Sequence, residues 1–483
     1  MGAGPASPAL RLVGAGWAGL ALRGAAAGGR GAGESGAAAG GRGVGGSGAG
    51  WGPFEAVRGL RPDGVLPQVT PIRRLLSDVP TEPDPYAAAQ AALAPLAGSV
   101  APGARIAVTA GSRGIHDLVI VVRAAVDWLR SVGAEPFVVP AMGSHGGATA
   151  EGQREMLAGL GVTPESVGCP IEATMETVVL GTLPDGTPVH HDALAAKADG
   201  VLLVNRVKPH TDFHGPVESG LAKILAIGLG NHDGAAALHA GGIPLLGSAI
   251  EAAARMVVAT GKILGGLAIL ENAHEKTAAV ELVVAEGIAG SAENALLQRA
   301  GSLMARLPFD SLDVLVVDEM GKDKSGTGMD TNVLGRCWVY GIPEFESPSI
   351  AAVSVHRLSE ASHGNASGLG LADVIPARLL EQIDLRTSYV NALTSGAGGA
   401  RRSRLPMVLE DDEAAVLGAV TMSGRRDWSD LRLARIRDTL SPNELMVTPA
   451  LLAEASERFD LEITGTARNL TDATGSLTSW GER

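Results

Sequence analysis

The chain has 483 residues, 46% of them hydrophobic, and a formal net charge of −13, which fits two or three globular domains and argues against a nucleic-acid-binding surface. Its two cysteines, Cys169 and Cys337, are far apart, which excludes a disulfide framework, a cysteine zinc site and an iron–sulfur centre held by the chain, and favours a cytoplasmic protein. No apolar run reaches the roughly 18 to 20 residues of a membrane helix, so we expect no membrane contact.

Residues 1–53 differ in composition from the rest. Between residues 23 and 51 the sequence consists almost only of Gly, Ala, Ser and Arg, which cannot bury enough apolar surface to fold. We therefore expect a disordered Gly/Ala-rich leader. The segment GAGWAG (residues 14–19) matches a dinucleotide-binding pattern, but no βαβ unit follows it, so we interpret the match as chance.

A strand, loop and helix unit recurs after the leader. The patterns predict strands at 105–109 and 136–139, each followed by a glycine loop and then a helix, at 117–132 and at 149–160 with Thr149 as N-cap. Further strands are predicted at 201–204 and 313–317. This alternation is typical of parallel sheets. We predict two α/β domains, at 54–305 and 306–483, with the active site in the cleft between them.

Polar side chains follow each of these predicted strands. Ligands of parallel α/β sheets bind outside the carboxyl ends of the strands. The sequence therefore predicts one pocket that collects polar side chains from four loops, namely Arg113, His145, His210 with His214, and Lys322 with Lys324.

Six of the 11 histidines fall between residues 190 and 239, which points to metal ligation or proton transfer. His210 follows Pro209 and suits acid/base work. Lys223 lies in an otherwise apolar segment and could act as a nucleophile toward a carbonyl or thiocarboxyl group. We predict that Asn231 caps a helix with His232 in its first turn and His239 seven residues later, where a neutral imidazole can bind Zn, Cu, Fe or Ni.

Several of these motifs resemble one known family. GSHGGAT (143–149), KPH (208–210), the lysine of ESGLAK (218–223) and NHDGA (231–235) look like those of the nickel-pincer lactate racemase family. The similarity continues through DEMGKDKSGTGMD (318–330) and SHGNASG (362–368). Members are 2-hydroxy-acid racemases and epimerases that transfer a hydride reversibly to a nickel pyridinium-3,5-bisthiocarboxylic acid mononucleotide. Gly146 stands where lactate racemases carry an arginine, which suggests a divergent subgroup.

The resemblance implies a role for each candidate residue. Lys223 would attach the cofactor, His232 would ligate nickel, and His145 and His210 would exchange the proton of the substrate hydroxyl group. The remaining implied contacts are Arg113 and Gly143 for the cofactor, and Arg113 with Lys322 or Lys324 for the substrate. The implied partners are a small anionic 2-hydroxy acid and the cofactor-assembly enzymes.

Two other interpretations remain open. The first is a zinc- or iron-dependent hydrolase or lyase whose ligands are His210, His214 and His232. The second is a non-catalytic protein that binds the cofactor or a hydroxy acid.

Overall fold

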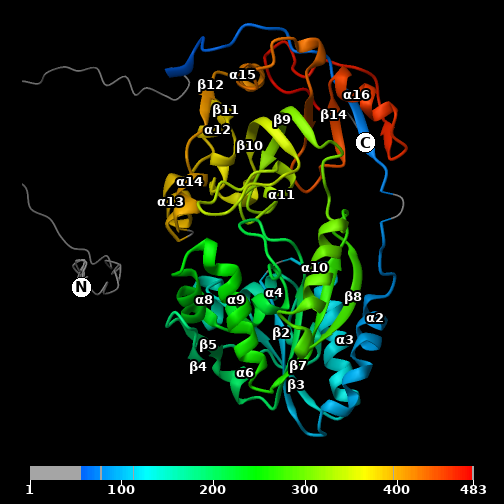
Figure 1. Ribbon diagram of the computed structural model, residues 1–483, viewed down its shortest axis with the longest axis vertical. Coiled ribbons are helices and arrows are strands. Elements are labelled where there is room, and N and C mark those ends of the chain that lie inside the picture. Colours follow the sequence, from blue (N-terminus) through cyan, green and yellow to red (C-terminus); the bar gives the residue numbers. More distant parts are fainter. Residues whose placement is uncertain (1–55, 77–78, 113, 395, 481–483) are drawn as a thin grey trace, which may run out of the picture. The chain divides into compact units, whose positions relative to one another are not determined.

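The computed structural model describes residues 56–76, 79–112, 114–394 and 396–480 (Figure 1). These described residues belong to one compact unit. The predicted leader at 1–53 and Arg113 fall outside the described residues. Within the described ranges, no helix combines the length and apolar character needed to cross a membrane.

A five-stranded sheet forms in the first half of the chain, in the order β3-β2-β6-β7-β8. Its first four strands run parallel and β8 is antiparallel to β7. The bounds are β2 (Arg105–Ala110), β3 (Glu135–Pro140), β6 (Gly200–Arg206), β7 (Ile263–Glu271) and β8 (Thr277–Val284). The three strands predicted here are thus confirmed.

Both faces of this sheet are covered by helices. Alternate residues of β6 enter two different cores: Val201 and Leu203 pack with α9 and α10, while Leu202 and Val204 pack with α2 and α3, which lie next to each other (Figure 1). Burial on both faces explains the nearly continuous apolar run of the strand. The helices of this half are α2 (Pro85–Leu93), α3 (Leu118–Ser131), α4 (Ala150–Gly159), α5 (Pro164–Val167), α6 (Ala193–Lys197), α7 (Leu221–Lys223), α8 (Asn231–His239), α9 (Ile243–Val258) and α10 (Ser291–Leu303).

The second sheet has eight strands in the order β12-β11-β10-β9-β13-β14-β1-β15. The five strands from β12 to β13 are parallel, and the remaining pairings are antiparallel. The bounds are β1 (Thr70–Arg74), β9 (Ser311–Met320), β10 (Ser349–Leu358), β11 (Val374–Pro376), β12 (Met407–Leu409), β13 (Leu433–Ile436), β14 (Glu444–Val447) and β15 (Leu461–Ile463).

The mixed pairing has a physical reason. A parallel pair needs a crossover of a dozen or more residues, but only residues 437–443 connect β13 to β14. The fold class is therefore α/β with largely parallel sheets, as predicted, with an antiparallel edge added to the second sheet. β1 belongs to this sheet although its residues lie in the range predicted for the first domain; the domain boundaries stay a prediction.

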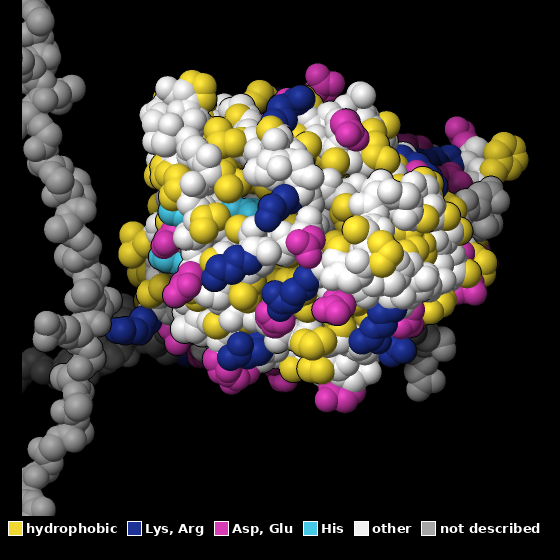
Figure 2. All heavy atoms as spheres, turned by 90° about the horizontal axis from the view of Figure 1, so that it is seen from below, with side chains coloured by type: hydrophobic (Ala, Val, Ile, Leu, Met, Phe, Trp, Pro, Cys, Tyr) yellow, Lys and Arg dark blue, Asp and Glu magenta, His cyan; other side chains and the backbone are white. Residues whose placement is uncertain are grey.

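The remaining elements pack around these sheets. A separate two-stranded antiparallel sheet pairs β4 (Thr177–Thr182) with β5 (Pro188–Asp192). The helices of the second half are α11 (Thr331–Leu334), α12 (Ala377–Leu380), α13 (Leu385–Thr394), α14 (Gly396–Arg402), α15 (Asp412–Met422) and α16 (Pro449–Ser456). On the face drawn in Figure 2, acidic and basic side chains are interspersed, so that face carries charges of both signs.

Candidate active site

A cavity of about 1420 Å³ lies at the carboxyl ends of parallel strands from both larger sheets. The loops that line it follow β2, β3, β6, β9 and β13 in the chain. This is the position at which ligands bind to sheets of this type. Among the predicted site residues, those that line the cavity are His145, His210, Lys223, Lys322 and Lys324.

The loop after β3 is held in an unusual conformation that presents His145. Gly143, Gly146 and Gly147 have positive φ, and at Gly146 a Cβ atom would lie 2.6 Å from the backbone nitrogen of Gln153. The buried Gln153 donates from Nε2 to the carbonyl oxygen of Gly143 over 2.9 Å. Only glycine accommodates both the left-handed backbone and this close contact. The predicted N-cap is confirmed, because Thr149 accepts the N–H of Gly152 at the start of α4.

His145 is exposed and contacts the loop after β2. Its Nδ1 lies 2.5 Å from Oγ of Ser112, which also lines the cavity. The contact restrains the imidazole at the cavity wall.

His210 is fixed on several sides in the loop after β6. Its Nδ1 accepts the backbone N–H of Asp212 over 3.0 Å. The backbone N–H of His210 donates to the carboxylate of Glu218 over 2.5 Å. The imidazole ring stacks on the ring of Phe213, with centroids 4.4 Å apart. Since Nδ1 is an acceptor, a neutral His210 carries its proton on Nε2.

Lys223 lies directly beside this histidine. Its Nζ is 2.7 Å from Nε2 of His210. If the Nε2–H of His210 is the donor, the lysine must accept as a neutral amine, which is the nucleophilic form. Lys223 ends α7, and a π-helical turn, η3 (Ile224–Gly228), follows at once. Such turns occur often at functional sites.

The environment keeps His210 uncharged. Burial of the ring, followed by the positive charge of a protonated Lys223, holds the pKa of His210 well below its usual value of 6.5. The carboxylate of Asp212 forms an ion pair with Arg402 of α14. Arg402 also donates to the carbonyl oxygen of Cys337 over 2.7 Å. Burial opposes ionisation of Asp212, but its basic neighbours, with Arg402 and Lys223 as the charged ones, lower its pKa. A neutral imidazole with its proton on Nε2 is a hydrogen-bond donor there, and Nε2 can act as a base only in the other tautomer, with the proton on Nδ1.

The two histidines of α8 differ in their surroundings. Both are exposed, but His239 lines the cavity and His232 is not among the lining residues. Nδ1 of His239 lies 2.7 Å from the carbonyl oxygen of Ala235, to which it must donate, and this leaves Nε2 unprotonated. The predicted N-cap was wrong: Gly230 caps α8, and Asn231 is buried and donates to Asp192 over 2.8 Å.

The two predicted lysines of the second half also differ. Lys324 is surrounded by carboxylates, with oxygens of Asp323 at 3.0 Å, Glu319 at 3.4 Å and Asp438 at 3.7 Å. Lys322 donates to the carbonyl oxygen of Gly326 over 2.7 Å. The ammonium of Lys324 is thus already neutralised by carboxylates of the protein, whereas Lys322 contacts an uncharged backbone carbonyl oxygen.

Gly143 is buried, and both of its backbone polar groups are used within the protein. Its N–H donates to the carbonyl oxygen of Gly228 over 3.1 Å, and its carbonyl accepts from Gln153. Its predicted contact with a cofactor stays a prediction, as do the roles predicted for the other site residues.

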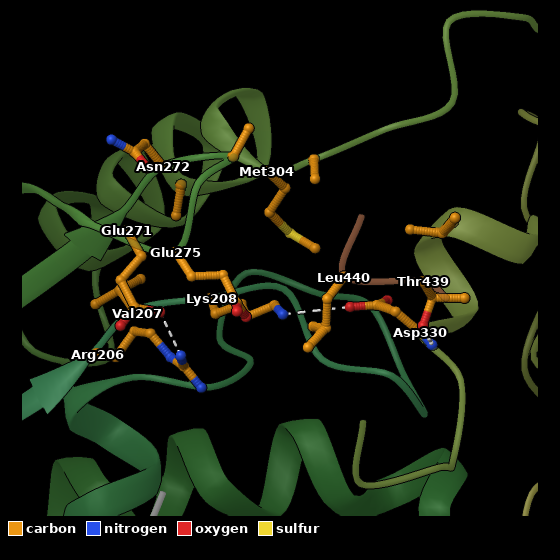
Figure 3. Close-up of a pocket in the computed structure, with 14 residues that line it drawn as sticks. Arg206, Val207, Lys208, Glu271, Asn272, Glu275, Met304, Asp330, Thr439 and Leu440 are labelled. Carbon is orange, nitrogen blue, oxygen red and sulfur yellow. Dashed lines mark hydrogen bonds and ion pairs between the residues drawn. The ribbon is translucent and has the colours of Figure 1, made fainter. Parts of the chain in front are cut away.

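A second, much smaller pocket of about 40 Å³ adjoins the cavity (Figure 3). The two pockets share Arg206, Lys208, Glu275, Asp330 and Leu440. Arg206 pairs with Glu271, and Nζ of Lys208 lies 3.2 Å from Asp330, as the dashed lines in Figure 3 mark. The second pair connects the loop after β6 to the segment before α11, and so fixes this part of the wall.

The three-histidine metal site finds no support in the described part of the chain. No group of three or more His, Cys, Asp or Glu side chains there is arranged to hold a metal ion. Instead, Glu218 accepts from the backbone N–H of His210 and lies 3.2 Å from Nδ1 of His214.

Comparison with known proteins gave only distant likenesses. No family model and no curated protein matches the chain. The lactate racemase apoprotein from Thermoanaerobacterium thermosaccharolyticum is a structural neighbour with a TM-score of 0.41 and 13% identity, over 77% of this chain and 88% of that chain. A protein from Thermotoga maritima has a TM-score of 0.41 and 16% identity, over 57% of this chain and 71% of that chain.

The sequence did not single out Ser112, Asp212 or Arg402. Each is a common polar residue in a loop or helix, without a pattern that marks it. Their contacts alone reveal that they position the histidines. Ser112 contacts His145, while Asp212 and Arg402 form the surroundings of His210.

Proposed function

We propose that this protein is a racemase or epimerase of a 2-hydroxy acid that uses a nickel-pincer nucleotide. One observation carries the proposal: His145 and His210 come from loops after two different strands and line the same cavity, in which Lys223 lies beside His210. Racemisation at a carbinol carbon needs a base for each enantiomer, because either hydroxyl group must lose its proton. Two imidazoles on separate loops meet this need.

The chain offers groups that fit such a cofactor. The amine of Lys223 would attach a thiocarboxyl group. The unprotonated Nε2 of His239 would supply an imidazole ligand to nickel, and we propose His239 for this role in place of His232. A histidine whose other nitrogen donates to a backbone carbonyl is the usual form of a metal ligand. When bound, the cofactor supplies the hydride acceptor.

The protein's own part is proton transfer and positioning. One histidine takes the proton of the substrate hydroxyl oxygen while the other, protonated, returns a proton on the opposite side when the reaction reverses. The low pKa of His210 keeps this imidazole neutral at neutral pH. Its Nε2 acts as the base when the ring proton moves to Nδ1, which requires the contact with the backbone N–H of Asp212 to open. We propose that Lys322 holds the substrate carboxylate.

The proposal is tested by producing the protein together with nickel-pincer assembly enzymes. Nickel content is measured by elemental analysis, and racemisation by chiral chromatography of 2-hydroxy acids deuterated at C2. We expect near-stoichiometric nickel, and racemisation with the deuterium retained. Exchange of C2 deuterium with solvent would indicate proton abstraction from carbon and contradict hydride transfer.

Two variants separate the candidate ligands. We expect His239→Ala to lose nickel and His232→Ala to keep it; the reverse result would restore the assignment made from the sequence. Stoichiometric zinc or iron bound without the assembly enzymes would favour the hydrolase or lyase. Nickel binding without turnover of any hydroxy acid would favour the binding protein.

A further inference from the structure

The wall of the cavity includes two large, exposed apolar side chains. Tyr340, between α11 and β10, is 83% exposed, and Leu393 of α13 is 81% exposed. Both line the cavity. Large apolar side chains exposed together in a concave site commonly mark a binding surface.

Other apolar side chains also line the cavity. Further apolar lining residues are Ile224, Ile227, Ile243, Pro244, Leu246 and Val339. The segment that carries Tyr340 packs closely on α9, because a Cβ atom at Gly341 would lie 2.9 Å from Cγ of Pro244. On its other side, Val339 approaches Gly398 of α14. The neighbours of Tyr340 in the chain thus contact two helices that both contribute lining residues.

Several cations of the cavity wall are already matched by carboxylates. Arg206 pairs with Glu271, Lys208 with Asp330, and Arg402 with Asp212. An additional anionic group on a substrate would have to compete with these internal partners. The charge pattern thus favours a ligand with one carboxylate over a dicarboxylate.

We propose that the cavity selects 2-hydroxy monocarboxylates with a bulky apolar or aromatic substituent, and that Tyr340 and Leu393 contact this substituent. The inference rests on the proposed function for the identity of the reacting group. The volume is consistent with it, since about 1420 Å³ exceeds the roughly 300 to 1000 Å³ of most ligand pockets. Burial of the substituent against apolar walls supplies the selectivity.

The test compares three ligands by calorimetry and by turnover, using the nickel-loaded protein. The probes are 2-hydroxy-3-phenylpropanoate, lactate and 2-hydroxybutanedioate. We expect the aromatic acid to bind about tenfold or more tightly than the other two. We expect Tyr340→Ala and Leu393→Ala to reduce the ratio of aromatic acid to lactate affinity at least several-fold. Leu385→Ala is the matched control, because Leu385 lies on the same helix, is 58% exposed and does not line the cavity.

Each outcome separates this inference from the proposed function. Preferential binding of the aromatic acid without racemisation would contradict the racemase and leave the binding preference intact. Racemisation with equal affinity for all three acids would contradict the preference and leave the racemase intact. A dimer in sedimentation analysis that dissociates in Tyr340→Ala or Leu393→Ala would assign these side chains to a second copy of the chain and overturn the inference.

Discussion

Nζ of Lys223 lies 2.7 Å from Nε2 of His210. Two groups that both bind protons thus face each other in a buried part of the cavity, and protonation of either one disfavours protonation of the other. The backbone N–H of Asp212 occupies Nδ1 of the same ring, so proton exchange with a ligand must take place on the Lys223 side. The positive charge of Lys223 therefore contributes to the lowered pKa of His210.

The first prediction follows from this pair. Lys223→Met removes a positive charge that lowers the pKa of His210, so we expect this pKa to rise while burial still keeps it below its ordinary value. Histidine ring signals followed by NMR across pH, with His210→Gln for assignment, measure the shift in the cofactor-free protein. Lys208→Met is the control, because Lys208 lines the same cavity but pairs with Asp330. An unchanged titration of His210 in Lys223→Met would contradict the pairing.

A second prediction concerns Arg402, which clamps the carboxylate of Asp212. Arg402→Met frees the segment whose N–H orients His210, and we expect kcat to fall about tenfold or more because a small displacement of a base is costly. The acidic limb of the pH–rate profile should shift as well. Arg401→Met is the matched control, since Arg401 is the exposed neighbour. Equal losses in both variants would indicate a general effect on α14.

Much of the first sheet could be predicted from the sequence. Strands such as β6 are apolar on both faces, and Thr149 is a strong N-cap, so local patterns suffice for them. The antiparallel edge of the second sheet could not be predicted, because β1 and β15 come from opposite ends of the chain and have only 5 and 3 residues. Pairing between such short, distant strands leaves no local pattern.

The site was predictable to a similar degree. His145 and His210 follow predicted strands, and that position alone brought them to one cavity. The sequence analysis favoured His232 as the nickel ligand. Both histidines are exposed on α8, and only the packing of this helix decides that His239 lines the cavity. The contact between Asp212 and Arg402 spans 190 residues of sequence and carries no motif.

The third prediction compares two glycines of the His145 loop. Gly146 and Gly147 both have positive φ, but a Cβ atom would clash with backbone atoms at Gly146 and meet nothing within 4 Å at Gly147. We expect Gly147→Ala to lower the free energy of unfolding by about 1 kcal/mol and Gly146→Ala by roughly 3 kcal/mol or more. Urea unfolding measures both. A similar loss in the two variants would mean that the loop relaxes around the added methyl group.

The fourth prediction separates the two lysines that follow β9. Lys322→Met should raise KM for a 2-hydroxy acid about tenfold or more, because it removes a charged hydrogen-bond donor. Lys324→Met leaves Asp323, Glu319 and Asp438 without their shared cation, so we expect it mainly to lower the free energy of unfolding, by about 1 kcal/mol. Steady-state kinetics and urea unfolding of both variants test this. A larger rise in KM for Lys324→Met would exchange the two roles.

The last prediction concerns acid stability and a histidine remote from the mechanism. Burial, followed by the charge of Lys262, lowers the pKa of His191 from 6.5 to about 4, and its buried Nδ1 has no hydrogen-bond partner. The unfolded chain therefore takes up a proton first as the pH falls. The stability that the folded protein has with a neutral His191 is fully present above about pH 6.5. The free energy of unfolding then decreases as the pH falls from there to about 4. The loss amounts to about 3 kcal/mol. In His191→Phe the free energy of unfolding, measured with urea between pH 4 and 8, should fall less steeply over this window, while its slope above pH 7 should match that of the wild type. An equally steep acid limb in the variant would show that His191 does not titrate in this range.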